Sequence, residues 1–277
     1  MQSNDFDLIL KPDRKLKGAM SELWSFRELF YVLAWRDFKV RYKQTIIGVL
    51  WAFIRPLVTM IVFTIIFSKV AGLPSQGEIP YALLVFAAML PWFFFSTSFQ
   101  EGTNALTTDA NIISKVYFPR IIIPISSLFV NLVDMSISLG IFFLLMIFFG
   151  FSPSSNLMFL PLFVVLAAAL TIACTLWMSA LNVMYRDVRY VIPFIVQFGL
   201  YLCPVGFASE TISNEWRWVY SLNPMVGIID GFRWSLLGAD IQFYLPSLMI
   251  SIFITLFLLV GGYRFFMKME RNFADII

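Results

Sequence analysis

Several apolar runs in this sequence are long enough to cross a lipid bilayer, and they constrain the fold more than any other feature. A helix rises about 1.5 Å per residue, so about 20 apolar residues cross a hydrocarbon core of about 30 Å. Backbone groups in lipid must be paired within the protein, which favours helices for runs of this length. The sequence therefore predicts an all-α integral membrane protein with six transmembrane helices, at about 48–70, 81–99, 121–149, 157–184, 191–208 and 241–263.

The composition agrees with a multi-pass membrane protein and offers few groups for enzymatic chemistry. Hydrophobic residues make up 60% of the chain, charged residues make up 13%, and the mean hydropathy is +0.81. The sequence has no histidine, and its two cysteines, Cys174 and Cys203, lie inside apolar runs. These facts argue against a metal site, a disulfide framework and a histidine-based catalytic triad. No apolar segment of a signal peptide follows Met1, so we expect the first span to direct membrane insertion.

The distribution of Lys and Arg predicts the topology. Nine of these cations precede the first expected span, two lie in 100–120, two in 185–190, and three from Arg264 onward. The opposite side has only Lys69, Arg217 and Arg233. Cytoplasmic loops carry the excess of cations, so both termini are expected in the cytoplasm.

A basic, aromatic segment directly precedes the first span. At 100° per residue its rings form one stripe, which consists of Tyr31, Trp35, Phe38 and Tyr42. This pattern predicts an interface helix that points its rings into lipid and its cations to the lipid phosphates. We assign Trp35, Arg36, Lys39, Arg41 and Tyr42 to it. The alternative is an ordinary juxtamembrane segment that serves only as a topology signal.

Polar residues also occur inside the expected spans. Arg55 lies about 10 Å beyond Gly48 by helical rise, which is shallow enough for its side chain to reach the interface and favours a structural anchor over a pathway residue. Asp134 shares one helical stripe with Ser127, Asn131 and Ser138. This stripe indicates a polar face turned to the bundle or to a water-filled route. Whether Asp134 contacts Arg55 or a substrate stays open.

Two short polar corners lie on the expected cytoplasmic side. Residues 104–116 have the pattern of a short amphipathic helix, with Ile112 and Ile113 on one side and Asp109 and Lys115 on the other. The sequence YRDVRY at 185–190 has the same character. Both corners could dock a soluble subunit, or they could be ordinary topogenic loops.

The segment 209–240, between the last two spans, contains two pieces that are too short and too polar to cross the membrane. The second piece has a helix signature, with Asn223 as the N-cap, Pro224 at the first helical position and Gly238 just past the end. Interfacial or re-entrant helices are favoured because both pieces have apolar faces to bury. The alternative is an outer loop with an aromatic belt.

Four motifs in order carry a resemblance to a known family. They are WRDFKVRYKQTIIGVLWAFIRP, NIISKVYFPR, NVMYRDVRYVIPFIVQFGLYLCPVGF and LNPMVGIIDGFRW. From about Leu29 to the C-terminus, the chain resembles the membrane subunit of ABC-2 type polysaccharide exporters, the O-antigen, capsule and teichoic-acid permeases. The resemblance implies a homodimer of six-span subunits, each docked on a separate nucleotide-binding ATPase subunit. It divides the chain into a cytoplasmic arm and interface helix (1–47), a transmembrane domain (48–266) and a cytoplasmic tail (267–277).

The same resemblance suggests roles for individual residues. It implies that 104–117 is a coupling helix and that 186–189 forms a second contact with the ATPase, through Asn111, Ser114, Lys115, Tyr117, Arg186, Asp187 and Arg189. It implies a pair of periplasmic gate helices at 213–237, with Trp216, Trp218, Tyr220, Asn223 and Pro224. Aromatic side chains line the channel in this family, but the sequence does not identify them among 31 Phe.

The chain contains no Gly-Lys pair and therefore no phosphate-binding P-loop. ATP and Mg²⁺ are accordingly expected on the partner subunit. The sequence thus predicts the permease subunit of an ATP-driven exporter of lipid-linked polysaccharide, with O-antigen favoured, in the bacterial inner membrane. No nucleic-acid partner is expected. The alternatives are an ABC-2 permease for a drug or lipid, or an integral-membrane enzyme with Glu101, Asp134 or Asp187 as catalytic carboxylates; absent histidine and scattered acids count against the enzyme.

Overall fold

The structure is a computed structural model that describes residues 24–43, 46–113, 115, 118–185, 187–238, 241, 243–270 and 273, without the side chains of 46–52. Three residues assigned to the expected coupling corners, Ser114, Tyr117 and Arg186, lie outside the described residues. The arm before residue 24 and most of the tail after residue 270 lie outside them as well.

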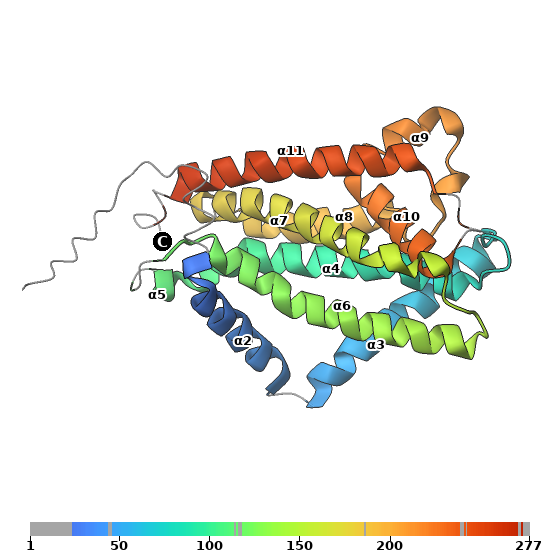
Figure 1. Ribbon diagram of the computed structural model, residues 1–277, viewed down its shortest axis with the longest axis horizontal. Helices are drawn as coiled ribbons and strands as arrows, with labels where there is room; N and C mark the ends of the chain where they lie inside the picture. The colour runs from blue at the N-terminus through green and yellow to red at the C-terminus, as the bar shows by residue number, and fades with distance from the viewer. Residues whose placement is uncertain are drawn as a thin grey trace, which may run out of the picture.

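All regular elements in the described residues are helical. They are α2 (Arg27–Lys43), α3 (Ile46–Phe63), the π-helix η1 (Thr64–Val70), α4 (Tyr81–Thr108), α5 (Ala110–Ile113), α6 (Ile122–Phe148), the 3₁₀ helix η2 (Ser155–Phe159), α7 (Leu160–Met184), α8 (Val188–Leu202), the 3₁₀ helix η3 (Ser209–Thr211), α9 (Asn214–Tyr220), α10 (Pro224–Leu237) and α11 (Leu245–Met269). The long helices α4, α6, α7, α8 and α11 lie along one axis, whereas α2 and α3 form a V on one side (Figure 1).

Helix α4 forms the centre of the bundle. It packs along α6 and α7, and its segment from Leu83 to Met89 is completely buried. The helix continues without interruption through Pro91. Because every face of this segment is apolar and most of its side chains are covered by neighbours, α4 has the character of a core helix surrounded by other helices.

The short helix α10 is also buried, and it packs against α4, α7 and α11. The Asn223 side chain caps it by accepting a hydrogen bond from the backbone N–H of Met225 at 3.1 Å. Gly227 permits a close approach to α11, since a Cβ atom there would lie 2.7 Å from the carbonyl oxygen of Ser247. The expected helix with its Asn cap, first-turn proline and terminal Gly238 is confirmed.

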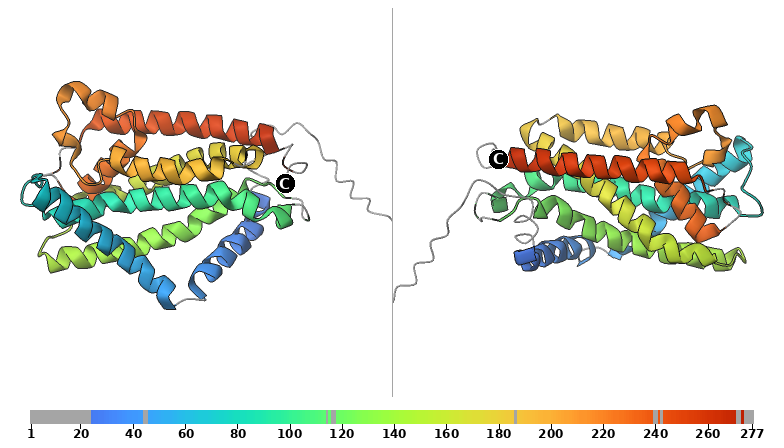
Figure 2. Two further views of the ribbon diagram at one scale, coloured as in Figure 1. Left: turned by 180° about the vertical axis from the view of Figure 1, so that it is seen from behind. Right: turned by 45° about the horizontal axis from the view of Figure 1, so that its top comes forward.

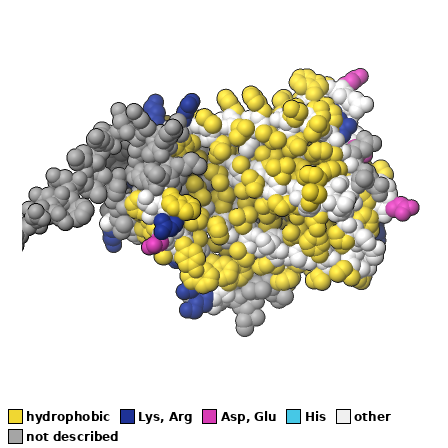
Figure 3. Space-filling view, viewed as in Figure 1, with side chains coloured by type: hydrophobic (Ala, Val, Ile, Leu, Met, Phe, Trp, Pro, Cys, Tyr) yellow, Lys and Arg dark blue, Asp and Glu magenta, His cyan; other side chains and the backbone are white. Residues whose placement is uncertain are grey.

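Five helical segments are long and apolar enough to cross a membrane in the part of the chain that the structure describes: Phe53–Val70, Tyr81–Thr108, Ile122–Phe148, Ser155–Met184 and Leu245–Met269. Helix α8 is apolar but shorter, with 15 residues. Figure 3 shows that hydrophobic side chains cover most of the face between the two ends of the bundle. The structure is therefore that of a multi-pass membrane protein.

Three expected boundaries were wrong. The fifth span was expected at 191–208, but α8 ends at Leu202, because Cys203 precedes a proline and takes an extended conformation. One separate helix was expected at 104–116. Instead, the residues up to Thr108 form the last part of α4, and the short helix α5 comprises Ala110–Ile113. The last span was expected at 241–263, but α11 begins at Leu245 and ends at Met269.

A second hydrophobic cluster explains why α4 and α11 extend beyond their expected ends. Leu106 on α4 and Phe266 on α11 are completely buried, and they belong to a cluster that also contains Leu33 of α2 and Ile113 of α5. This cluster lies at the end of the bundle where α2 and α5 gather (Figures 1 and 2). Apolar burial at this end stabilises helical turns that a hydropathy pattern assigns to loops.

Candidate functional site: a charged cluster and cavity beneath α2

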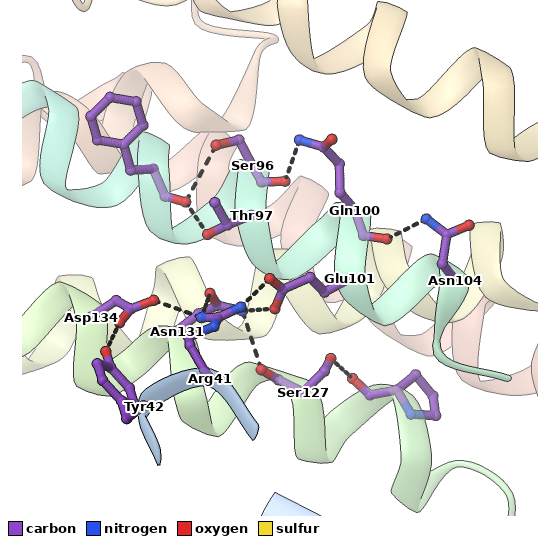
Figure 4. Close-up of polar contacts among 12 residues, drawn as sticks. Arg41, Tyr42, Ser96, Thr97, Gln100, Glu101, Asn104, Ser127, Asn131 and Asp134 are labelled. Atoms are coloured by element: carbon purple, nitrogen blue, oxygen red, sulfur yellow. Dashed lines mark hydrogen bonds and ion pairs between the residues drawn. The ribbon is translucent and has the colours of Figure 1, made fainter. Parts of the chain in front are cut away.

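Arg41 of α2 connects two long helices. Its guanidinium donates to Asp134 Oδ2 at 2.6 Å and to Asn131 Oδ1 at 2.9 Å, both on α6, and it also forms an ion pair with Glu101 on α4. Figure 4 shows this guanidinium between the two helices, with the two carboxylates on opposite sides. Charge-assisted hydrogen bonds are among the strongest that side chains form, so Arg41 holds α2 against both helices.

Neighbouring polar groups complete the cluster. The Tyr42 hydroxyl donates to the second oxygen of Asp134, and Asn131 Nδ2 donates to Glu101 Oε2 at 2.8 Å. Burial and the bond to Asp134 raise the pKa of Tyr42, which therefore stays a hydrogen-bond donor at neutral pH. We call Arg41, Tyr42, Glu101, Asn131 and Asp134 the Arg41 cluster. The expected polar face of α6 thus points into the bundle, and Asp134 contacts Arg41 and Tyr42.

Arg36 forms a second link, one helical turn or more away along α2. Its two terminal nitrogens donate to the two carboxylate oxygens of Asp109, at 3.0 and 2.7 Å, and its Nε donates to Asp37 at 2.8 Å. Asp109 lies at the turn between α4 and α5, and its bonds raise the pKa of Arg36. Arg36 and Arg41 were both expected to face lipid phosphates, and both instead point to carboxylates of the bundle.

The expected aromatic stripe on α2 is present. Its rings follow one another with centroid separations of 6.3, 5.3 and 4.8 Å, in the order Tyr31, Trp35, Phe38 and Tyr42. The ammonium group of Lys39 lies 5.5 Å from the Trp35 ring centroid. Tyr31 and Trp35 are exposed, which leaves one end of the stripe open to the surroundings of the bundle.

A cavity of about 320 Å³ lies beside the Arg41 cluster, between α2, α3, α4 and α6. Its wall on α4 is apolar and aromatic, with Phe86, Met89, Leu90, Phe93 and Phe94. Its other lining groups are Arg41, Tyr42, Arg55, Pro56, Thr97, Glu101, Asn131, Asp134, Met135 and Ser138. The cavity thus combines a polar end with an apolar wall, which suits an amphiphilic ligand.

Arg55 reaches this cavity from α3. Its guanidinium lies 5.0 Å from the ring centroid of Phe93, and its side chain is exposed. Arg55 takes no part in the Arg41 cluster. Arg55 and Asp134 line the same cavity, but Asp134 is paired with Arg41 and not with Arg55.

The expected cytoplasmic corners are only partly described. Asn111, Lys115, Asp187 and Arg189 are all exposed, while Ile113 is buried against the bundle. The Arg189 guanidinium lies over the Tyr190 ring, 4.9 Å from its centroid. These corners therefore present polar side chains outward from an apolar base.

On the opposite end of the bundle, Trp216 and Trp218 are exposed on α9, and Tyr220 is half-buried. Arg233, a cation expected in the outer segment, is completely buried instead. It donates to the carbonyl oxygens of Leu84, Phe207 and Val205 at 3.1, 3.0 and 3.1 Å. Sequence reasoning missed this role, although a lone arginine inside the apolar face of a short helix was a usable signal.

Asp230 lies one helical turn before Arg233. It accepts a hydrogen bond from the hydroxyl of Ser209, which joins α10 to η3. Burial raises the pKa of Asp230 to about 6, against the opposing effect of the nearby Arg233. This buried polar group fixes α10 to the segment that follows α8.

The described residues contain no group of three or more His, Cys, Asp and Glu side chains arranged to hold a metal ion. In the Arg41 cluster the carboxylates are engaged by an arginine, a tyrosine and an asparagine. Such an arrangement can bind, orient and transmit displacement between helices. It does not present the paired acid and base that a hydrolytic reaction needs.

The fold and this site define a helical multi-pass membrane protein, and comparison with known proteins identifies its class. Residues 28–237 match the ABC-2 type transporter family, and the chain belongs to this family. It is 29% identical to the O-antigen export system permease protein RfbA of Myxococcus xanthus over 215 residues, which are 76% of this chain and 81% of that protein. It is 26% identical to a protein of the same name from Klebsiella pneumoniae over 253 residues, 90% of this chain and 95% of that protein.

Proposed function

We propose that this chain is the permease subunit of an ATP-driven exporter that moves lipid-linked O-antigen polysaccharide outward across a bacterial inner membrane. The observation that carries the proposal is the family match over residues 28–237, together with relatives that are named O-antigen export permeases and align with most of the chain. The multi-pass helical bundle supports it, since five of its helical segments can cross a membrane.

We infer that ATP and Mg²⁺ bind to a separate ATPase subunit, because the sequence lacks a P-loop. Two copies of that subunit and two copies of this chain form the working assembly. Helix α8 is the sixth crossing beside the five long segments, so both termini lie in the cytoplasm. The positive-inside distribution of Lys and Arg supports this orientation. In this orientation, the end of the bundle with α2, α5 and the last turn of α11 lies on the cytoplasmic side.

A second copy of the chain is expected against the face formed by α3 and α8. Both helices lie on the face seen from behind, on either side of α4 (Figure 2, left). Among their described side chains, several are exposed on this part of the surface, including Phe194, Phe198 and Tyr201 on α8. A conduit between two such faces presents aromatic rings to the sugar chain. Flat apolar ring faces suit a sliding polymer because they hold it in no single pose.

The contacts beneath α2 offer a route from the ATPase to the bundle. A displacement of α5 moves Asp109, which directly precedes α5. The Asp109 carboxylate accepts two hydrogen bonds from Arg36 of α2. Helix α2 is in turn bonded through Arg41 to α4 and α6. Movement of α5 therefore changes the free energy of contacts on two membrane helices, which is what coupling between distant sites requires. On the outer side, α9 and α10 act as the gate that limits leakage.

Deletion of the gene tests the function. We expect a lipid-linked glycan to accumulate inside the deletion strain, and the matching surface polysaccharide to disappear until the gene is restored. Composition analysis of the accumulated glycan separates O-antigen from capsule and teichoic acid. An ATPase should co-purify with the chain and depend on it for full activity. Loss of drug or lipid efflux with intact surface glycan would support the drug or lipid permease, and catalysis without any ATPase would support the enzyme.

A further inference from the structure

The cavity beneath α2 has three chemically different parts. Phe86, Leu90 and Phe93 form an apolar wall, the Arg41 cluster forms a polar end rich in oxygen atoms, and Arg55 places a cation beside the wall. Binding sites are usually mostly apolar, with a few polar groups that fix orientation. These three parts together specify a ligand that is apolar at one end, anionic in the middle and rich in hydroxyl groups at the other end.

Arg55 supplies the strongest constraint on the ligand. The two arginines of α2 described above are matched by carboxylates, but among the described residues Arg55 has only the Phe93 ring as a partner. It also lies in a segment that is apolar and long enough to cross the membrane. A cation in such a segment is costly unless it meets a negative group or water. An arginine fork fits a phosphate ester through two parallel hydrogen bonds.

The polar end of the cavity favours neutral hydroxyl groups of a ligand, whereas Arg55 favours an anionic group. Glu101 and Asp134 are paired with Arg41, so a second anion near them meets two negative groups and a single shared cation. Carboxylate oxygens can still accept further hydrogen bonds, and Asn131, Tyr42 and Ser138 add further polar atoms. Hydroxyl groups of a neutral sugar satisfy this end without adding negative charge.

We propose that this cavity binds the lipid–phosphate–sugar junction of the exported glycolipid, with its phosphate on Arg55, its first sugar at the Arg41 cluster and its lipid chain along the α4 wall. The proposal rests on the proposed function, since it names the part of that substrate which the subunit holds. A volume of about 320 Å³ suits the junction, while the long lipid and the polymer extend beyond it. Arg55 is then a substrate-binding residue, where the sequence favoured an anchor.

Binding of a short substrate analogue tests the proposal directly. The chain is purified with its ATPase partner, and farnesyl diphosphate, farnesol and dilauroyl phosphatidylglycerol are titrated separately. We expect farnesyl diphosphate to bind, farnesol to bind at least tenfold more weakly, and Arg55→Gln to weaken farnesyl diphosphate binding at least tenfold. Arg55→Lys should retain part of the affinity, because it keeps the charge but loses the fork. Lys69→Gln is the matched control, since it removes an exposed cation from the same span outside the cavity.

A second variant tests the place of binding without changing charge. Ser138 lines the cavity and is only half-buried, so Ser138→Phe narrows the cavity with little disturbance of the core. We expect it to weaken farnesyl diphosphate binding as Arg55→Gln does, while the complex elutes normally in size-exclusion chromatography. Equal binding to wild type, Arg55→Gln and Ser138→Phe would overturn the proposal. Binding of dilauroyl phosphatidylglycerol as tightly as farnesyl diphosphate would also overturn it, because the occupant would then be bulk phospholipid.

Export in cells separates a failure of this proposal from a failure of the proposed function. If Arg55→Gln cells display normal surface glycan while the deletion strain displays none, the chain is an exporter and the binding site is wrong. If the deletion strain also displays normal glycan, the proposed function itself fails. The expected result is a loss of surface glycan with Arg55→Gln, at unchanged membrane levels of the protein, and normal export with Lys69→Gln.

Discussion

Arg36 and Asp109, which lie 73 residues apart in the sequence, face each other with two parallel hydrogen bonds of 3.0 and 2.7 Å. The arginine belongs to the helix that precedes the first span, and the aspartate belongs to the turn between α4 and α5. The pair therefore joins the interface helix to the corner expected to meet the ATPase. Two parallel hydrogen bonds fix the relative orientation of the guanidinium and the carboxylate as well as their separation, whereas a single charged contact fixes the separation alone.

Removal of this pair should uncouple ATP hydrolysis from export. Arg36→Gln and Asp109→Asn each keep hydrogen-bonding capacity but lose the ion pair, so we expect reduced export per ATP hydrolysed with normal assembly of the complex. Their effect on stability should be small, and a double-mutant cycle should give a coupling of about 0.5–1 kcal/mol, since Arg36 is 35% exposed. The measurement is glycan export and ATPase activity in the same vesicles.

The double variant is the decisive comparison. If Arg36 and Asp109 act as one unit, the export loss of the double variant should equal that of either single variant. Additive losses would show that each residue acts separately. Lys39→Gln is a suitable control, since its side chain lies on the same helix over Trp35 and forms no contact with the α5 corner in the described structure.

Asp134 should matter more for transport than for membrane insertion. Asp134→Leu leaves the Tyr42 hydroxyl without its acceptor and leaves Arg41 with one carboxylate, so we expect a stability loss of about 1–3 kcal/mol and strongly reduced surface glycan. Asp134→Asn should lose less, because it still accepts from Tyr42. The control is Ser136→Leu, which changes an exposed position on the same helix. Equal export by Asp134→Leu and wild type would contradict this prediction.

The sequence predicted the apolar helices well, because their information is local. The third span was expected at 121–149 and α6 covers Ile122–Phe148, and the polar stripe of Asn131 and Asp134 was expected to face the bundle or a water-filled route. An apolar run needs no knowledge of its neighbours to be assigned to the membrane. The end of α8 is also marked locally, since Cys203 precedes Pro204, but the residues that follow are apolar and continue the hydropathy pattern of a span.

The site could not be predicted in the same way, because its contacts are long-range. Arg41 finds its partners 60 and 93 residues away, and nothing in its own sequence context distinguishes it from a cation that faces lipid. Arg233 differs in that its place in the apolar face of a short helix indicated burial, but its three acceptors, which are backbone carbonyls, could not be identified in advance. Backbone carbonyls occur at every position, so no residue pattern marks them as partners.

The packing of α10 on α11 should be sensitive to one methyl group. A Cβ atom at Gly227 would lie 2.5 Å from Ser251 Oγ and 2.7 Å from the Ser247 carbonyl oxygen, so Gly227→Ala requires a shift of backbone. We expect a loss of about 1–3 kcal/mol and a lower melting temperature. Gly140→Ala is the matched control: it is also helical, nothing lies within 4 Å of its Cβ position, and the change should stabilise by about 0.5–1 kcal/mol. Equal melting temperatures of the two variants would contradict close packing at Gly227.

Asp230 should make the stability of the protein fall as the pH rises toward neutrality. Helix α10 is not one of the membrane-spanning segments, and burial raises the pKa of Asp230 from 3.8 to about 6, with Arg233, Arg217 and Glu210 as the charged groups that act on it. Between these two values the folded protein holds a proton that the unfolded chain has lost. The free energy of unfolding therefore decreases from about pH 4 to about pH 6, by about 3 kcal/mol in total.

Asp230→Asn removes this titration and keeps an acceptor for the Ser209 hydroxyl. The variant can be more or less stable than wild type at low pH, since an amide there replaces a protonated carboxyl, and this exchange adds an offset that does not change with pH. The difference in melting temperature between variant and wild type should nevertheless shift in favour of the variant from pH 4 to pH 7. Glu210→Gln, which lies beside the same group but is only half-buried, should leave most of the pH dependence in place. A difference between Asp230→Asn and wild type that stays constant with pH would show that Asp230 keeps an ordinary pKa, because an ordinary carboxyl has lost its proton in both states before the pH reaches 6.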